Sequence, residues 1–267
     1  MLLLSNSMIN SWLDIQEGDG CGLLFEAIYV KREIKDERTT DAQEAGQFFE
    51  YKATGALAYG GKVPLAKYRA NTSTLLPEFE IALRQAARFK DFLKTIKAKI
   101  VAVGREVIDE AKGSILHLDL EVDLPGSLHR RIWGPTANLS KPVIIDLKFT
   151  AGIDASYGEF AWAAEGLPKK KGLTRQAIHY QWTTEQDFAW YLADPSIRML
   201  RRFYPVNISE ETLENHGRFV GEVREEILEA IQDGFIPNPS EDRCEECPLF
   251  STCPSRAEMP VPQVIEL

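Results

Sequence analysis

The sequence predicts an α/β fold in which a mixed β-sheet is flanked by helices. Three observations lead to this expectation. Residues 77–96 are strongly amphipathic, with apolar side chains three or four positions apart. Four strand-like segments follow between residues 100 and 150, and a second strongly helical segment covers residues 210–233. Helix, strand meander, and then helix and strand again is an order typical of a sheet sandwiched between helices.

The individual elements are expected as follows. Helices are predicted at residues 5–14, 41–54, 77–96, 174–192 and 210–233. Strands are predicted at residues 100–108, 114–124, 129–133, 142–150 and 199–208, with Leu124-Pro-Gly-Ser as a turn. Residues 152–172 are expected to be irregular, as segments that border a site often are.

Composition and charge limit the class of protein. With 267 residues and 44% hydrophobic content, the chain can form one large domain or two small ones. It has no run of about 18 apolar residues, so no transmembrane helix is expected. Met1-Leu-Leu-Leu is too short for a signal peptide, which favours a cytoplasmic location. A net charge of −9 argues against a protein that coats nucleic acid through bulk charge.

The negative net charge of the chain is still compatible with a local basic groove. Lys169-Lys-Lys171 with Arg175 forms one basic cluster, and Arg198, Arg201 and Arg202 form another. Either cluster can equally be a solvated surface.

The segment Val143-Ile-Ile-Asp-Leu-Lys-Phe149 combines a buried-strand pattern with two charges. Asp146 and Lys148 are two residues apart and therefore share a face of the strand. Burying either charge costs several kcal/mol unless it has a partner or a metal. The pattern predicts a metal-dependent site that cleaves phosphodiesters, with Asp146 holding a cation and Lys148 beside the attacking water. The alternative is a structural ion pair on an edge strand.

Further acids alternate with apolar residues in 116–123, which places His117, Asp119, Glu121 and Asp123 on one face. A solvated strand face explains this alternation. In the functional interpretation, one of these acids meets Asp146, and Mg²⁺ or Mn²⁺ lies between the two carboxylates. Gln176 and Tyr180, four apart on a helix, point the same way and could orient a catalytic group or a phosphate. They could also belong to an ordinary half-buried helix face.

The four cysteines are split one plus three. Cys21 lies near the start, and Cys244-x2-Cys247-x5-Cys253 lies near the end. Disulfides are disfavoured in a cytoplasmic protein, so Zn²⁺ or an iron–sulfur cluster is expected. Structural zinc usually draws its ligands as two close pairs, so the uneven split favours the cluster, which would join the two ends of the chain.

Taken together, these residues resemble the RecB-like branch of the PD-(D/E)XK nuclease superfamily. They are most similar to its iron–sulfur members, the AddB nuclease domain and the CRISPR-associated RecB-like exonucleases. The matching positions, in order and over nearly the whole chain, are Cys21, Glu50, Asp119, Asp146 with Lys148, Gln176 with Tyr180, and Cys244, Cys247 and Cys253.

The resemblance implies a restriction-endonuclease-like core in a single nuclease domain, 1–267. Residues 41–233 would form the catalytic core, and residues 1–40 with 234–267 would bind a [4Fe–4S] cluster, or Zn²⁺ as the alternative. Asp119, Asp146, Glu50 and the Leu147 carbonyl would hold Mg²⁺ or Mn²⁺. Lys148 would position or help deprotonate the water, supported by Gln176 and Tyr180.

The implied activity is hydrolysis of DNA, as an exonuclease that prefers single strands, in recombination, repair or mobile-element processing. Tyr157, Phe160 and Trp162 could stack on bases or pack in the core. Gly60-Gly-Lys62 does not complete a phosphate loop, so a helicase or recombination partner would supply any unwinding.

Two positions depart from the family pattern. Glu50 stands where the family often has His, and Leu116 and His117 stand where a Gly is usual before the motif Asp. Asp123 is therefore an alternative to Asp119 as ligand. Two rival functions are a catalytically inactive iron–sulfur factor for DNA binding or assembly, and a one-electron carrier.

Overall fold

The computed structural model describes residues 1–34, 40–57, 63–154, 162, 171–239, 244 and 247–255. The chain divides into two compact units. The first comprises Thr39–Arg218 with Met1, and the second comprises Leu2–Arg38 with Phe219–Leu267. The early cysteine and the three late ones therefore belong to the same unit.

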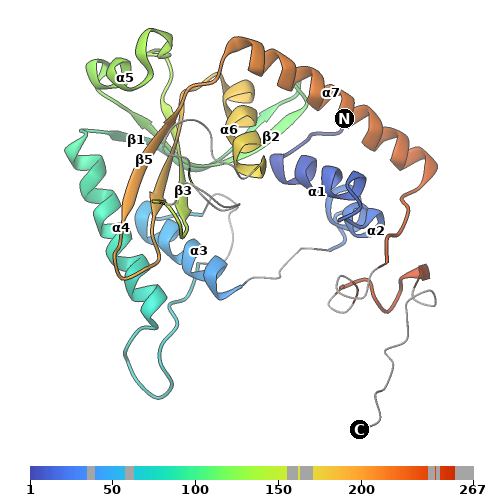
Figure 1. The fold of residues 1–267 in the computed structure, drawn as a ribbon, viewed down its shortest axis with the longest axis horizontal. Coiled ribbons are helices and arrows are strands. Elements are labelled where there is room, and N and C mark those ends of the chain that lie inside the picture. Colours follow the sequence, from blue (N-terminus) through green and yellow to red (C-terminus); the bar gives the residue numbers. More distant parts are fainter. Residues whose placement is uncertain are drawn as a thin grey trace. The chain divides into compact units, whose positions relative to one another are not determined.

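The first unit is built on a five-stranded mixed sheet (Figure 1). Its strands are β1 (Lys99–Asp109), β2 (Ser114–Asp123), β3 (Val143–Phe149), β4 (Phe188–Ala193) and β5 (Arg201–Val206), in that order across the sheet. Only β3 and β4 pair in parallel; the other neighbours are antiparallel. The predicted α/β class, a central mixed sheet flanked by helices, is confirmed.

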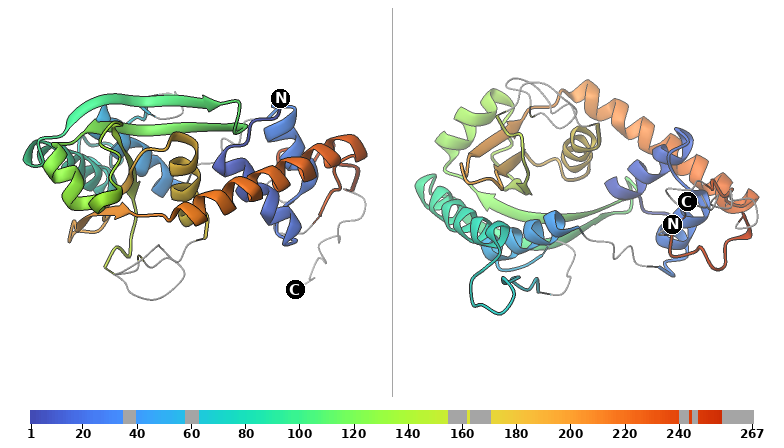
Figure 2. Two further views of the ribbon diagram at one scale, coloured as in Figure 1. Left: turned by 90° about the horizontal axis from the view of Figure 1, so that it is seen from above. Right: turned by 60° about the horizontal axis from the view of Figure 1, so that its bottom comes forward.

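Helices cover both faces of this sheet, and each face has its own core (Figures 1 and 2). On one face pack α3 (Asp41–Thr54) and α4 (Pro77–Thr95), with a core that includes Phe49, Phe89 and Ile145. On the other face packs α6 (Lys171–Thr184). Every residue of β4 is buried because alternate side chains enter the two cores.

The apolar side chains of β2 pack in one core before Asp119 and in the other core after it. Leu116 and Leu118 pack in the α6 core, whereas Leu120 and Val122 pack in the α3–α4 core. Across from this point on β1 lies Gly104, with φ +60, between two paired residues of that strand. A Cβ there would lie 2.9 Å from the Leu57 carbonyl oxygen, so the position requires glycine. The β2 strand therefore twists near Asp119, and the strict alternation of its apolar and polar side chains between two faces, which the sequence predicted, does not continue through this point.

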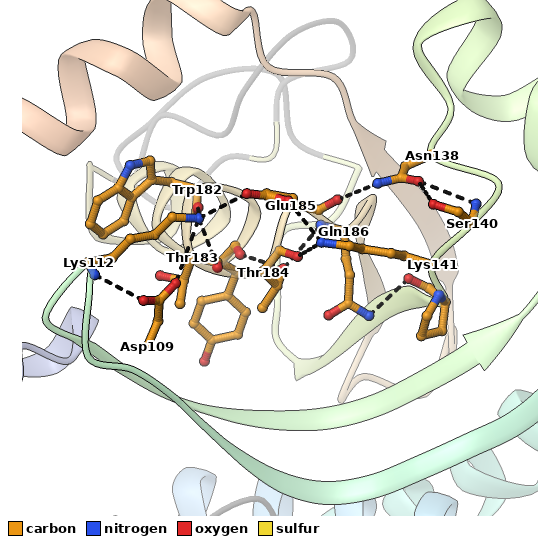
Figure 3. Close-up of polar contacts among 12 residues, drawn as sticks. Asp109, Lys112, Asn138, Ser140, Lys141, Trp182, Thr183, Thr184, Glu185 and Gln186 are labelled. Atoms are coloured by element: carbon orange, nitrogen blue, oxygen red, sulfur yellow. Dashed lines mark hydrogen bonds and ion pairs between the residues drawn. The ribbon is translucent and has the colours of Figure 1, made fainter.

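Two secondary-structure predictions are wrong. Residues 129–133, predicted as a strand, belong to helix α5 (Gly126–Trp133), where His129 and Trp133 are one turn apart with ring centroids 5.1 Å apart. The helix predicted to run to residue 192 ends at Thr184. Glu185 then adopts φ +56, and Lys112 and Lys141 donate to the last carbonyls of α6 (Figure 3). The apolar residues that follow form β4 because they fit a strand buried on both sides.

The remaining predicted helices are confirmed: α1 (Asn6–Gln16), α3, α4 and α7 (Glu210–Asp233). The strand predictions at 100–108, 114–124, 142–150 and 199–208 correspond to β1, β2, β3 and β5. Three short elements were not expected: α2 (Gly22–Phe25), the π-helical η1 (Glu26–Val30) and the 3₁₀ turn η2 (Gly134–Thr136).

The second unit packs the N-terminal helices on the later part of α7. Trp12 donates its indole N–H to Glu226 at 2.8 Å, and its ring packs on Phe25. Gly22 lies so close to Ile236 that a Cβ would come within 2.5 Å of the Ile236 carbonyl oxygen. The segment that carries Cys21 thus lies against the segment that leads toward Cys244. No helix among the described residues has the length and apolarity needed to cross a membrane.

Candidate active site

Two buried aspartates face each other where β2 and β3 separate. The strands are paired as far as Leu120 with Ile145, and the same register places Asp119 opposite Asp146. Asp119 is 8% exposed and Asp146 is 2% exposed. Asp119 Oδ2 accepts a hydrogen bond from the Leu147 N–H at 2.8 Å, in place of a further backbone bond between the strands.

Lys148 lies on the same face of β3 as Asp146. Its Nζ is 2.7 Å from Asp146 Oδ2, and 27% of its side chain is exposed. Although the ammonium forms this ion pair, the buried Oδ2 accepts no hydrogen bond from the described residues. The other oxygen, Oδ1, accepts from Gln176 Nε2 at 2.9 Å. Asp146 therefore has one oxygen held by the Gln176 amide and one held by the Lys148 ammonium.

The site concentrates negative charge in a place poor in solvent. Burial, then Asp146 and Glu50, raise the pKa of Asp119 well above its ordinary value. Lys148 and the Leu147 N–H act in the opposite direction on this pKa, but burial is the larger influence. Asp146, Glu50 and Lys148 all act electrostatically on Asp119, and this concentration of carboxylates favours an added cation.

Glu50 reaches the site from helix α3. The preceding residue, Phe49, is fully buried and its ring is stacked on Phe149 of β3, with centroids 5.4 Å apart. This contact fixes the end of α3 against β3, and Glu50 is then close enough to act electrostatically on Asp119. The sequence predicted Glu50 as a ligand only through the family resemblance.

Gln176 and Tyr180 connect α6 to both central strands. Besides its bond to Asp146, Gln176 lies 3.4 Å from the Tyr180 hydroxyl. Tyr180 is buried and donates its hydroxyl to the His117 carbonyl of β2 at 3.0 Å. Gln176 and Tyr180 therefore form hydrogen bonds to the two strands that carry the aspartates.

The four acidic or basic positions on the predicted face of β2 have different surroundings. Asp119 and Glu121 are buried, whereas Asp123 is exposed and pairs in register with Lys99 at the end of β2. Glu121 makes a contact that the sequence did not predict. Arg105 of β1 donates to it through two nitrogens, one at 2.6 Å, and Gln186 donates at 2.8 Å. Such a cross-strand contact leaves no periodic signal in the sequence.

The carboxylates of the site are the candidate ligands for a metal ion. Among the residues that the structure describes, no three His, Cys, Asp or Glu side chains are grouped so as to hold a metal ion. Asp119 and Asp146 form a facing pair, and Glu50 acts electrostatically on Asp119. The Oδ2 of Asp146, which is ion-paired with Lys148, and the carboxylate donor set suit a hard divalent cation such as Mg²⁺ or Mn²⁺.

The cysteines are free thiols of intermediate burial. Cys247 donates its N–H to the Cys244 carbonyl at 3.2 Å, so these two residues share one turn. Thiolates suit iron or zinc. The cluster itself stays a prediction.

Other predicted contact residues are only partly described. Trp162 is buried against Trp190, with ring centroids 5.4 Å apart, so it packs in the core. Tyr157, Phe160, Gly60-Gly-Lys62 and the side chains of Lys169-Lys-Lys171 lie outside the described residues. Arg198 pairs with Asp154 at 2.7 Å, Arg201 is exposed, and the Arg202 guanidinium lies 5.3 Å from the Tyr204 ring centre.

Comparison with known proteins agrees with this architecture. The chain is similar to a crystal structure from Eubacterium rectale described as a "putative exonuclease", with TM-score 0.57 and 18% sequence identity. The match covers 99% of this chain and 91% of that one. No protein-family model and no curated protein matches the sequence. At this level of identity the likeness concerns the fold, and the chain shares that fold over nearly its whole length.

Proposed function

We propose that this chain is a metal-dependent deoxyribonuclease of the PD-(D/E)XK class, in its RecB-like branch. The observation that carries the proposal is the Asp146–Lys148 ion pair inside a buried strand, facing a second buried carboxylate, Asp119. An ion pair kept only for stability would not need a further buried acid beside it, one whose pKa is raised by burial and by neighbouring carboxylates. The fold shared with a protein described as an exonuclease supports the same class of activity.

A divalent cation would be held by Asp119 and Asp146, assisted by Glu50 and the Leu147 carbonyl. When bound, it would polarise the scissile phosphate and lower the pKa of a water molecule. It would also relieve the repulsion from Asp146 and Glu50, which together with the larger effect of burial raises the pKa of Asp119. The carboxylates are therefore arranged for a ligand that the ammonium of Lys148 only partly replaces.

The side chains of the protein perform the remaining tasks. Lys148 is partly exposed beside the acids, where its ammonium positions the attacking water and offsets the charge that develops on the phosphate. Gln176 holds the Asp146 carboxylate in one orientation through its 2.9 Å bond. Tyr180 fixes β2 through the His117 carbonyl, and so maintains the separation of the two strands.

We further propose that Cys21, Cys244, Cys247 and Cys253 hold a [4Fe–4S] cluster, with Zn²⁺ as the alternative. Their thiolates would tie the two ends of the chain together, because all four belong to the second unit. The substrate bound at the acidic site would be DNA, preferentially single-stranded. A helicase or recombination protein would supply the unwound ends.

The test is a cleavage assay on protein purified without oxygen. Labelled single-stranded DNA, free or blocked at either end, is incubated with Mn²⁺ or Mg²⁺, and EDTA provides the metal-free reaction. Wild type is expected to degrade the DNA, and Lys148→Ala is expected to lose at least about 100-fold in rate. The end blocks distinguish an exonuclease from an endonuclease and give its polarity.

Lys94→Ala is the matched control, because Lys94 is an exposed lysine of α4 that pairs only weakly with Asp91, at 3.4 Å. It should cleave like wild type. If wild type and Lys148→Ala are equally inert while the cluster is intact, the catalytic proposal is wrong. DNA binding under those conditions would favour the inactive iron–sulfur factor.

A further inference from the structure

Helix α6 presents different faces to the site and to the rest of the unit. Gln176 and Tyr180 face the strands, where they bond Asp146 and the His117 carbonyl. His179 precedes Tyr180 and lies on a different face of the helix, with none of its surface exposed. Any rotation of α6 about its axis would move all three side chains together.

Both ring nitrogens of His179 have hydrogen-bond partners on other elements. Its Nε2 lies 3.1 Å from Ser114 Oγ, at the start of β2, and its Nδ1 lies 3.0 Å from His216 Nε2 on α7. Ser114 Oγ in turn lies 2.8 Å from Thr183 Oγ1 on α6. Because the two nitrogens diverge from one rigid ring, turning α6 would stretch at least one of these bonds.

Close packing surrounds this hydrogen-bonded chain. A Cβ at Gly217 would come 2.9 Å from Trp182 Nε1, so the first turns of α7 lie directly on α6. The His179 and Trp182 ring centroids are 5.8 Å apart, and those of Trp182 and His216 are 5.5 Å apart. A larger residue at position 217 would require the Trp182 side chain to shift.

The C-terminal end of α6 is held separately. Figure 3 shows Lys112 and Lys141 reaching its last turn from two sides. Lys112 Nζ donates to the Trp182 carbonyl at 2.7 Å, and Lys141 Nζ donates to the Thr184 carbonyl at 2.8 Å. These bonds limit movement of α6 along its axis. Rotation about the axis is limited by the bonds of His179.

Packing alone does not require two buried imidazoles. Apolar side chains of similar size would fill the same space without the desolvation of four ring nitrogens. Burial, and secondarily Arg175, lowers the pKa of His216 to about 4, so its ring is neutral at neutral pH. Buried polar groups of this kind are used to specify one arrangement among several that pack equally well.

We propose that the His216–His179–Ser114 chain sets the rotation of α6 and thereby holds Gln176 on the Asp146 carboxylate, which makes His179 a positioning residue for DNA cleavage. The inference rests on the proposed function, because the effect of His179 is expected to appear in that reaction.

The decisive experiment is a double-mutant cycle of His179→Phe and Gln176→Ala, read as kcat and KM on single-stranded DNA. His179→Phe keeps the ring volume and removes both hydrogen bonds. It is expected to lower kcat by about 10- to 100-fold with KM within about threefold of wild type. His179→Gln, which retains one donor and acceptor, should recover part of this loss. Adding Gln176→Ala to His179→Phe should cause little further loss.

Phe89→Leu, a large-to-small change in the opposite core, controls for loss of stability. At a temperature where it matches His179→Phe in fraction folded, it should retain wild-type kcat. Additive losses in the cycle, or an equal fall of kcat in Phe89→Leu, would show that His179 does not act through Gln176.

A second measurement does not depend on activity. Hydrogen exchange of residues 171–184 and 114–120 should speed up in His179→Phe, and much less in stability-matched Phe89→Leu. If exchange is equal in both variants, the positioning proposal is overturned even for an inert protein. If wild-type protein shows no metal-dependent cleavage but exchange differs as expected, the proposed function has failed and the role of His179 in orienting α6 stands.

Discussion

Strand β2 carries two buried acids, Asp119 and Glu121, two residues apart, and their surroundings are opposite in kind. Glu121, 2% exposed, accepts two bonds from the Arg105 guanidinium and one from Gln186. Asp119, 8% exposed, accepts one backbone N–H and faces two further carboxylates. Glu121 is compensated by the Arg105 guanidinium, whereas Asp119 lies among carboxylates whose effect Lys148 only partly offsets.

This difference separates a structural from a functional buried charge. A protein can keep a buried acid whose charge is only partly balanced where a bound ligand balances the rest. Such acids are found mainly at active sites. The Asp119–Asp146 pair has that character, and the Arg105–Glu121 pair does not. Substitutions at the two places should therefore have opposite effects on activity and stability.

The largest expected effect is on activity at Asp119. Asp119→Asn should reduce cleavage by about 1,000-fold or more, because it removes a charged ligand of the proposed cation. The amide oxygen can still accept the Leu147 N–H. With the repulsion from Asp146 and Glu50 removed, the free energy of unfolding should be unchanged or higher by about 1 kcal/mol. Cleavage rates and urea unfolding without metal measure the two quantities. A large loss of stability would mean that Asp119 is structural.

The second effect is on stability at Arg105. Arg105→Met leaves the buried Glu121 carboxylate with Gln186 as its one remaining hydrogen-bond donor among the described residues, and the free energy of unfolding should fall by about 2–4 kcal/mol. Cleavage by the folded fraction should stay within about threefold of wild type. The double variant Arg105→Met with Glu121→Met removes both charges and should recover much of the loss. If it does not, the bidentate geometry contributes more than charge compensation.

Much of this architecture could be predicted from local sequence signals. The period of apolar residues located α4 and α7, and the same-face spacing of Asp146 and Lys148 is a direct consequence of strand geometry. Residues 129–133 were misassigned because Ile and Trp suit strands as well as helices, and tertiary packing of Trp133 decided the outcome. The end of α6 was missed because two lysines from distant loops stop the helix at Thr184.

Contacts between segments far apart in the sequence could not be predicted from local patterns of residues. Nothing in the spacing of residues shows that Arg105 meets Glu121 or that His179 meets His216, 37 positions later. The point where β2 changes cores lies opposite Gly104, which belongs to a different strand. Glu50 could be connected with Asp119 only by a resemblance to a family, since helix and strand are brought together by packing of Phe49 on Phe149.

A smaller effect is expected at Gly104, which lies opposite the point where β2 changes cores. Gly104→Ala introduces a Cβ at φ +60 and brings it to 2.9 Å from the Leu57 carbonyl oxygen. The loss of stability should be about 1–3 kcal/mol, measured by urea unfolding. Gly221→Ala, on α7 where a Cβ meets nothing within 4 Å, is the control and should be neutral or stabilising. A neutral Gly104→Ala would show that the β1–β2 twist does not depend on this residue.

The smallest effect is the dependence of stability on pH in EDTA. The folded-state pKa of Asp119 is raised above its ordinary value of 3.8, mainly by burial. Between those two pKa values the native state binds more protons than the unfolded chain, so its stability decreases as pH rises. One such group can change the free energy of unfolding by at most about 1.4 kcal/mol per pH unit. The free energy of unfolding of wild type relative to Asp119→Asn should therefore fall with increasing pH above 3.8, and then level off above the folded-state pKa. Saturating Mn²⁺ should reduce this difference, because a cation favours the ionised carboxylate. A difference that is constant with pH would show that Asp119 is compensated in the folded protein as fully as Glu121, and the contrast between the two acids would disappear.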